Sequence, residues 1–445
     1  MRTIASTQPV TLTNTASGTP IVLESDSRSL FAIDFSASGL AEVARVVADG
    51  GGKSAAEVAW LSGGTVAVSV DASVDVKLGV GGPLIPGLSG GSSAPIELAR
   101  LGSDYVLAWH RRISSTGARL ELHPLAWTSG VAAIALHAGN TIVVGTGADA
   151  DSTLPSTGLR SMSLVRFGDA GQVIGVARLA SFDGDTPPTS EAAATTRGTI
   201  ALFVHALGPA DIGLGAKHHA VAAGAPVDIV AELDAAGDVA WNAVITGASG
   251  PDVAGRVIAA APEGSVFLSF VAPGAASFGA TPIRMASGPA ATWAPLVRIG
   301  SDGVAIWSFA PNGVSVTGLE ARDDGSVVAA MTAGQFAAID PDTSSVLDFG
   351  DETWTLLLAE YDPEGHLAWY SDLGHVPVAT FRGGLSNFIG ADGLTPGSGV
   401  DDVVVIARSR GNLGLHDGSN AGSGVLQHLW RVNSLSGLSC RGSPR

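Results

Sequence analysis

The chain has 445 residues, of which 46% are hydrophobic and only 15% charged, and it contains 59 glycines. This composition excludes an intrinsically disordered protein, which needs low hydrophobicity and high net charge, and the glycines lack the three-residue period of collagen. The 24 basic and 41 acidic residues give a formal net charge of −17, which argues against nucleic acid or an anionic membrane surface as the partner.

The N-terminal segment does not read as an intact signal peptide. The opening MRTIASTQPVTLTNTASG has one basic residue and no apolar core. The chain also lacks a run of about 18 apolar residues, so we expect no membrane insertion. The single cysteine, Cys440, allows no internal disulfide. A lysine-poor chain rich in Gly, Ser, Thr and Ala favours an exported protein whose leader has been removed. We therefore expect an extracellular, surface-associated or periplasmic location, with the cytoplasm as the alternative.

A ten-residue pattern recurs along the chain, with a glycine in the sixth place and a tryptophan in the tenth. It is clearest in ELDAAGDVAW (232–241), RIGSDGVAIW (298–307) and EYDPEGHLAW (360–369). The sixth-place residues are spaced by 66, 66, 66, 66 and 62, and a weaker seventh copy ends at Gly437; they are Gly39, Tyr105, Gly171, Gly237, Gly303 and Gly365. A period held over five intervals predicts a repeat architecture.

Two further markers recur in the same order. One is a turn residue before a β-branched run, at 64–68, 140–144, 198–202, 264–268 and 325–329. The other is an apolar residue followed by glycine, at 78–79, 144–145, 214–215, 278–279, 349–350 and 413–414. Each unit therefore reads as four short strands, A to D, joined by Gly- and Asp-containing turns.

In chain order, residues 10–13 and 20–24 are expected to supply strands A and B of the first unit, and 131–136 (VAAIAL) strand A of the third. The fifth unit shows the pattern best, with A at 256–261, B at 265–270, C at 295–299 and D at 304–309. Strand D is apolar on both faces, which predicts a sheet covered on both sides. No run of ten or more residues has helical periodicity.

Four-stranded antiparallel units of about 60 residues predict an all-β fold, a single β-propeller domain over residues 1–445. Seven blades are expected, with six as the alternative in which N-terminal strands close the last blade. The expected blades cover residues 9–47, 55–114, 128–181, 189–247, 254–311, 315–375 and 380–440.

The segment VAELDAAGDVAWNAVITG, followed by VAGRVIAAAPEGSVFLSFV, resembles the bacterial β-propeller repeat often labelled SBBP. The NHL-type repeat is similar in its two-hairpin organisation. The resemblance covers most of residues 28–437. It departs from the family where Tyr105 replaces the turn glycine, where Gly175 replaces the tryptophan, and in long loops near 80–95 and 379–400. It implies a propeller found in secreted or surface-associated bacterial proteins, but it does not imply a reaction.

The tight A–B and C–D turns are expected on one face of the propeller and the long B–C loops on the other. We therefore expect ligands on the long-loop face, formed by residues 79–94, 145–160, 207–226, 271–293, 333–353 and 409–424. The candidate ligand-facing residues there are Trp293, Trp354, His416 and Asp417.

A bound Ca²⁺ or other divalent metal is a further possibility in these loops, although no complete metal-binding motif is present. The spacings match neither a zinc site nor the twelve-residue calcium loop, so exposed loop tips and turn capping explain these residues more simply. The candidate ligands are His218, His219, Asp149, Asp151, Asp183 and Asp185.

No catalytic residue or cofactor follows from the sequence. The G-x-S-x-G match at 87–91 lacks the strand–turn–helix that a nucleophile needs. We therefore favour a non-enzymatic propeller, a binding or structural module of a bacterial surface or extracellular assembly, with a protein or glycan as partner. The alternative is a propeller enzyme of glycoside hydrolase or lyase type at the channel mouth, where strand A offers Glu57, Glu191, Arg256 and Glu320.

Overall fold

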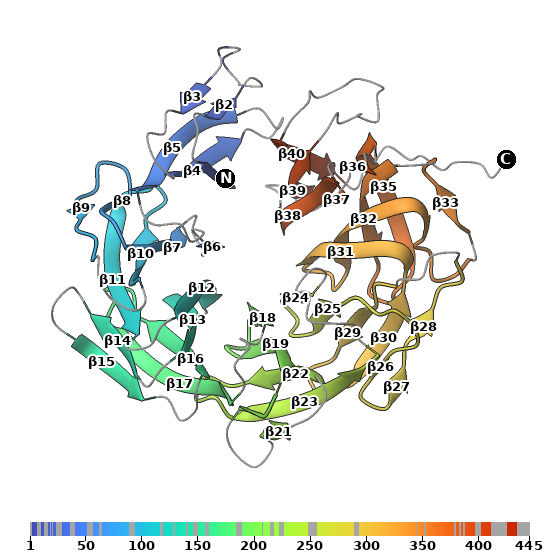
Figure 1. Cartoon of the computed structure of the whole chain (residues 1–445), viewed down its shortest axis with the longest axis horizontal. Coiled ribbons are helices and arrows are strands. Elements are labelled where there is room, and N and C mark those ends of the chain that lie inside the picture. Colours follow the sequence, from blue (N-terminus) through green and yellow to red (C-terminus); the bar gives the residue numbers. More distant parts are fainter. Residues whose placement is uncertain are drawn as a thin grey trace. The chain divides into compact units, whose positions relative to one another are not determined.

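The computed structural model consists of β-strands and turns, with no helix among the described residues, which confirms the all-β prediction (Figure 1). The structure describes residues 2–6, 10–12, 17, 19, 21–23, 29–35, 41–50, 57–61, 65–88, 94–115, 119–127, 130–138, 141–145, 150–155, 160–183, 189–206, 208–213, 218–221, 227–247, 256–288, 293–343, 345–350, 353–377, 380–381, 384–385, 388–396, 402–410 and 425–433. No candidate membrane-spanning helix occurs in this part of the chain.

The chain divides into two compact units, the first made of residues 1–187, 208–224 and 233–239. Its first sheet has the order β1 (Arg2–Ser6), β4 (Ser29–Phe35), β5 (Ala41–Gly50), β8 (Val76–Leu78) and β9 (Leu84–Ile85). Its second sheet has the order β15 (Ala150–Pro155), β14 (Thr141–Gly145), β11 (Leu107–Ser115), β10 (Ile96–Leu101), β7 (Val66–Asp71) and β6 (Glu57–Trp60). The third has the order β12 (Arg119–Trp127), β13 (Gly130–Ala138), β16 (Arg160–Phe167), β17 (Val173–Phe182), β20 (Ala210–Ile212) and β21 (His219–Val221).

The second unit is made of residues 188–207, 225–232 and 240–445. Its first sheet has the order β18 (Thr189–Ala194), β19 (Ile200–Ala206), β22 (Val227–Leu233), β23 (Val239–Thr246), β26 (Ser277–Phe278) and β27 (Thr281–Pro282). The next has the order β24 (Val257–Ala260), β25 (Val266–Ser269), β29 (Leu296–Ile299), β30 (Ala305–Ala310) and β28 (Arg284–Met285). The third sheet of this unit has the order β31 (Asn312–Ala321), β32 (Val327–Ala338), β34 (Thr353–Tyr361) and β35 (Leu367–Pro377), and β33 (Leu347–Asp348) also pairs with β32.

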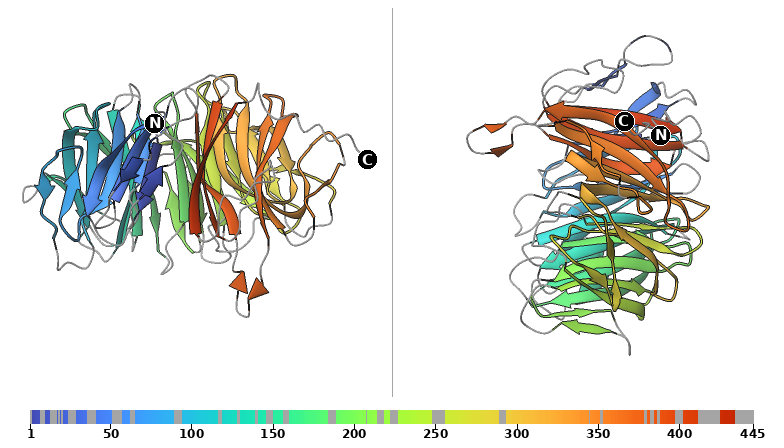
Figure 2. Two further views of the ribbon diagram at one scale, coloured as in Figure 1. Left: turned by 90° about the horizontal axis from the view of Figure 1, so that it is seen from above. Right: turned by 90° about the vertical axis from the view of Figure 1, so that its right-hand side faces the viewer.

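The last sheet of the second unit consists of β38 (Phe388–Pro396), β39 (Asp402–Arg410) and β40 (Val425–Asn433). Before it, β36 (Thr380–Phe381) and β37 (Gly384–Leu385) form a hairpin of their own, which stands apart from the sheet of β31, β32, β34 and β35 in both views of Figure 2. In the first unit, β2 (Val10–Leu12) and β3 (Ile21–Leu23) also form a separate hairpin.

From the second to the sixth repeat, consecutive strands A to D lie side by side in one sheet, and the long B–C segments add strands to the preceding sheet. Four of these segments pair antiparallel with the D strand of the repeat before them: β8 with β5, β14 with β11, β20 with β17 and β26 with β23. The apolar–glycine marker follows two of these strands directly, and its glycine N–H donates to a D-strand carbonyl from Gly79 to Val47 (2.8 Å) and from Gly279 to Val244 (2.9 Å). In the fourth repeat the donor is Gly213, to Leu179 (2.6 Å), whereas the marker at 214–215 lies outside the described residues. The segments expected to be irregular loops therefore partly belong to neighbouring sheets.

Three strand predictions are wrong. The segment 131–136 lies in β13, which is strand B of the third repeat, because β12 pairs with it from the other side. Of the marker at 140–144, residues 141–144 belong to β14 and thus to the second sheet, not to the third. In the first sheet β1 pairs with β4, so residues 10–13 and 20–24 do not supply its strands A and B.

The expectation that strand D is covered on both faces is also wrong at its beginning. Ala240 is exposed, and Val304 and Ile306 keep 59% and 55% of their surface in solvent. The added strands pair only with the last residues of strand D, as Ile245 does with Phe278. The outward side chains in the first half of the strand therefore remain in water.

Candidate functional site

The recurrent glycine and tryptophan meet each other between consecutive repeats. Gly303 has a φ of 82°, and a Cβ at this position would lie 2.7 Å from Cγ of Trp241, in the repeat before it. Gly171 is related to Trp109 in the same way at 2.7 Å. The turn backbone thus lies flat on the indole ring, where no side chain fits and where L-residues are disfavoured by the positive φ. We call this contact the glycine–tryptophan joint.

The four tryptophans hold one register, as predicted. Trp109, Trp307 and Trp369 lie opposite Arg100, Arg298 and Glu360 on strand C. Trp109 and Trp241 are buried and the other two are partly buried, so none of the four is exposed. Their rings belong to the packing between sheets, as the tilted contact of Trp307 with Tyr361 at 6.4 Å shows.

The two exceptions to the pattern have physical explanations. Tyr105 takes the glycine place with a φ of 63°, and its side chain is buried in the cluster that contains Leu30 and Leu78. The preceding repeat has valine, not tryptophan, in the tenth place, so the tyrosine supplies bulk that the indole supplies elsewhere. In the repeat before Gly237, Gly175 takes the place of the tryptophan. A Cβ on Gly237 would lie 2.5 Å from the carbonyl oxygen of Arg178 instead of against an indole.

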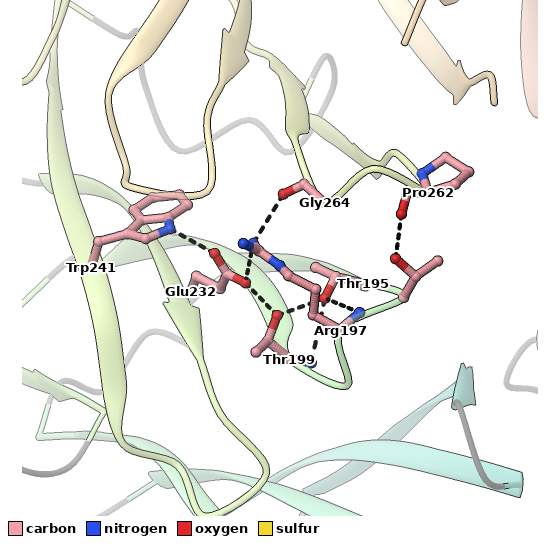
Figure 3. Close-up of polar contacts among 8 residues, drawn as sticks. Thr195, Arg197, Thr199, Glu232, Trp241, Pro262 and Gly264 are labelled. Carbon is pink, nitrogen blue, oxygen red and sulfur yellow. Dashed lines mark hydrogen bonds and ion pairs between the residues drawn. The ribbon is translucent and has the colours of Figure 1, made fainter. Parts of the chain in front are cut away.

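A dense polar network surrounds Glu232, which is 2% exposed at the end of β22 (Figure 3). Its Oε1 accepts from Nη2 of Arg197 at 2.6 Å and from the hydroxyl of Thr199, and its Oε2 accepts from Nε1 of Trp241 at 2.6 Å. Arg197 also donates to the carbonyl of Gly264 at 2.9 Å, in the A–B turn of the next repeat. The carboxylate therefore joins the turn, the indole and the following repeat, and both of its oxygens are occupied.

The same place is filled with reversed charge in the next repeat. Arg298 replaces the glutamate on strand C and donates to Glu263 at 3.0 Å, and Glu263 replaces the turn arginine. The indole of Trp307 then finds no carboxylate and donates instead to the carbonyl of Pro363 at 3.2 Å. Paired polar groups in corresponding turns of successive repeats indicate a structural joint rather than a ligand site.

The sixth repeat again pairs a strand-C glutamate with an arginine, although Arg322 takes the turn position of Thr195 and Asp324 that of Arg197. Nε1 of Trp369 donates to Glu360 at 2.9 Å, and Arg322 lies 3.3 Å from the same carboxylate oxygen. Within this turn, burial opposes ionisation of Asp324, but hydrogen bonds from Ser326 and the charge of Arg322 hold the pKa of Asp324 below its usual value. The first unit has a comparable cluster, in which Glu97 binds Arg112 and, at 3.0 Å, His110.

One buried cluster does not recur as a set in another repeat within the described residues. His205 at the end of β19, Asp228 at the start of β22 and Arg256 before β24 are 2%, 5% and 5% exposed. Nδ1 of His205 lies 3.0 Å from Oδ1 of Asp228, which also accepts from Nε of Arg256 at 3.0 Å. This arrangement fixes the imidazole with its Nε2 buried and without a hydrogen-bond partner within the described residues.

Arg256 was expected among the charged residues of strand A, whereas no sequence motif pointed to His205 or Asp228. Each of these two stands near one end of a mostly apolar strand run, IALFVHA and VDIVAEL, and that position could have indicated them. An acid, an imidazole and a guanidinium in contact can orient a base, but a reaction also needs an open pocket in which a substrate can bind.

The four predicted metal ligands within the described residues, His218, His219, Asp151 and Asp183, form no group of three suited to a metal ion. His218 is exposed and its Nε2 lies 3.9 Å from Oδ1 of Asp211, while His219 pairs within β21. Asp183 is exposed, and Asp151 lies in β15. No group of three or more His, Cys, Asp or Glu side chains suited to a metal ion occurs within the described residues. Asp149, Asp185, His416 and Asp417 lie outside them.

The two candidate aromatic residues are partly buried. Trp293 packs against the hydrophobic cluster of the fourth and fifth repeats, and its indole donates to the carbonyl of Ala286 at 3.0 Å. Trp354 lies near the start of β34, and its buried Nε1 has no hydrogen-bond partner within the described residues.

Comparison with known proteins gives no family. No family model and no curated protein matches the chain. Among solved structures, a protein of unknown function from Bacteroides caccae is 9% identical with a TM-score of 0.35, over 82% of this chain and 94% of the other. The PQQ domain of pyranose dehydrogenase from Coprinopsis cinerea is 13% identical with a TM-score of 0.29, over 96% and 97%. The V. cholerae biofilm matrix protein Bap1 is 12% identical with a TM-score of 0.15, over 84% and 80%. Likenesses this weak do not establish a function.

Proposed function

We propose that the chain is a seven-bladed β-propeller that serves as a non-enzymatic binding or structural module of a bacterial surface or extracellular assembly. The repeat order of the sheets supports the propeller, because strands A to D of one repeat form one sheet and the next repeat begins a new one. The SBBP-like sequence pattern supports the bacterial surface setting.

The observation that carries the binding role is one B–C segment of the first unit. Val74, Leu84 and Leu88 are 51%, 63% and 53% exposed within fifteen residues. The segment is not loose, because β8 and β9 are paired, and the N–H of Leu88 donates to the carbonyl of Ala72 at 3.0 Å. Large apolar side chains held in water on a fixed segment are typical of an interaction surface. They support a protein or glycan partner on the long-loop face.

The polar clusters support a non-enzymatic role. The Glu232 network lies within a joint between repeats, and its acceptors are filled by turn residues and an indole. The buried His205 cluster favours the alternative, a glycoside hydrolase or lyase type of enzyme, because it contains a fixed imidazole and a carboxylate.

Glycan-array binding combined with an assay for released sugar ends tests the proposal on the full chain. Binding of a glycan whose chain length then stays unchanged over hours supports the binding module. Accumulation of new reducing ends or unsaturated products would overturn it in favour of the enzyme, and His205→Gln would then identify the responsible cluster by abolishing the release.

A further inference from the structure

An open groove of about 620 Å³ lies beside strands β5 and β8 of the first unit. Two cations, Arg45 and Lys77, line it together with Asp49 and the turn at residues 79–81. The apolar part of its lining consists of Ala44, Val46 and Val80. A volume of this order fits a small ligand of two or three rings rather than a folded partner.

The two cations contrast with several other arginines of this chain. On a chain with a net charge of −17, Arg112 and Arg178 have carboxylate partners in Glu97 and Asp211. Arg45 and Lys77 are exposed, and neither forms an ion pair or hydrogen bond within the described residues. They give this one groove a positive potential on an acidic protein, which attracts anions locally.

The described acid of the groove, Asp49, has hydrogen-bond partners other than these cations. Asp49 lies opposite Lys77 in the pairing of β5 with β8. Its Oδ1 nevertheless accepts from the hydroxyl of Ser29 at 2.6 Å and from the N–H of Gly50 at 3.1 Å. The groove therefore offers two cationic donors and, beside them, a carboxylate that can accept from hydroxyl groups.

The turn of the groove leaves room for close approach to the backbone. Gly81 is exposed with a φ of 65°, and no atom lies within 4 Å of the place where its Cβ would be. A ligand that uses the whole lining carries carboxylates for Arg45 and Lys77, hydroxyls for Asp49 and the backbone, and short C–H faces for the two valines. The described residues that line the groove include no aromatic ring, which disfavours a nucleotide base.

The geometry points to a binding site for an acidic oligosaccharide, a short chain of sugars that carry carboxylates. This assignment rests on the proposed role as a binding module and names its ligand class. Arg45 takes one carboxylate in the two-pronged geometry of a guanidinium, and Lys77 contacts another as a compact charge. The net acidity of the chain predicts a cationic or neutral partner, but the groove selects the opposite charge locally.

Isothermal titration with trigalacturonate, a trisaccharide of three uronic acids, tests the site on the full chain. We expect binding that weakens as salt rises past about 0.15 M, and no binding of the neutral galactose trisaccharide. Arg45→Gln or Lys77→Gln alone should weaken binding about tenfold or more, because each removes one charge-assisted contact. Arg284→Gln, which changes another exposed arginine outside the groove, should leave the affinity unchanged.

The outcomes separate the groove from the wider proposal. Circular dichroism and thermal unfolding should match the wild type in all variants, since the changed side chains are exposed. Equal affinity of the Arg45→Gln, Lys77→Gln double variant for trigalacturonate overturns the groove and leaves the binding module standing. Equal binding of adenosine monophosphate, or no binding of trigalacturonate to the wild type, also overturns the assignment. Release of shorter uronates would instead contradict the non-enzymatic function.

Discussion

Replacing Gly303 by alanine should destabilise the chain by about 2–5 kcal/mol. Holding an L-residue at a positive φ costs about 1–2 kcal/mol, and φ is 82° here. The new Cβ would also lie 2.7 to 2.8 Å from three atoms of Trp241. Overpacking of this kind adds about 1–3 kcal/mol. The measurement is the shift in unfolding midpoint in urea, followed by circular dichroism.

Gly279 provides the matched control. Its φ is 55°, and no atom lies within 4 Å of its Cβ position, so Gly279→Ala should cost only about 1–2 kcal/mol. In a Trp241→Ala background, itself about 3–5 kcal/mol less stable, Gly303→Ala should cost less than in the wild type, because the indole is gone and only the close approach to Cβ of residue 241 remains. If Gly303→Ala costs as much without the indole as with it, the glycine–tryptophan joint does not explain the repeat.

Three further predictions follow from the polar contacts. Arg298→Glu should destabilise the fifth repeat by about 1–3 kcal/mol, because the new carboxylate faces Glu263. Adding Glu263→Arg should recover most of this loss by recreating the Arg197–Glu232 pattern. Chemical unfolding measures both variants, and no recovery would show that the order of the charges is incidental. Asp228→Asn should lower the free energy of unfolding by about 3–5 kcal/mol, because Arg256 stays buried without the charge of Asp228. Asp211→Asn, in a part-exposed pair with Arg178, should lower it by under about 1 kcal/mol. Similar losses in the two variants would contradict the burial argument. The hydrogen bond to Asp342 at 2.6 Å and the charge of that residue raise the pKa of His366. The pair therefore stabilises the fold below the ordinary histidine pKa of about 6.5, and this contribution is lost as pH rises through the raised pKa. NMR titration should show a lower pKa of His366 in Asp342→Asn, and an unchanged pKa would refute the pairing.

Much of the fold follows from the sequence because its markers have local causes. The turn glycines require a positive φ. Each tryptophan stands nine residues after a residue of strand C and lies opposite it in the sheet, as Trp369 lies opposite Glu360. Their common spacing therefore predicted the four strands of a unit and the buried indoles. Side-chain alternation could not predict the exposure of Ile306, since that depends on which strand covers the sheet.

The long B–C segments were harder to interpret for a related reason. Pairing of β20 with β17, or of β26 with β23, joins residues 28 to 33 positions apart, and no local pattern fixes such a partner. The apolar–glycine marker was visible, but its meaning, a glycine N–H donated to the preceding sheet, required the structure. Replacing residues 207–226 by a short turn would therefore remove β20 with its buried Ile212, so this segment cannot be exchanged without loss of stability.

The candidate sites were predictable only in part. Arg256 stands out as a charge at the start of an apolar strand, but its partners His205 and Asp228 come from two other strands. The groove cations Arg45 and Lys77 are also distant in sequence, and only the pairing of β5 with β8 brings their strands together. Sequence can flag such residues singly, whereas their convergence is a property of the sheet.

The most direct test of the propeller is the distance between its first and last repeats. Spin labels at Ser38 and Ser436, in a Cys440→Ser background, occupy the same C–D turn place in the first and seventh units by sequence. The reference pair is Ala170 and Ala236, which take that place in consecutive repeats and are exposed. A closed ring of seven blades predicts one narrow distance for the first pair, similar to the reference. A distance much longer than the reference, or a broad distribution, would contradict the ring.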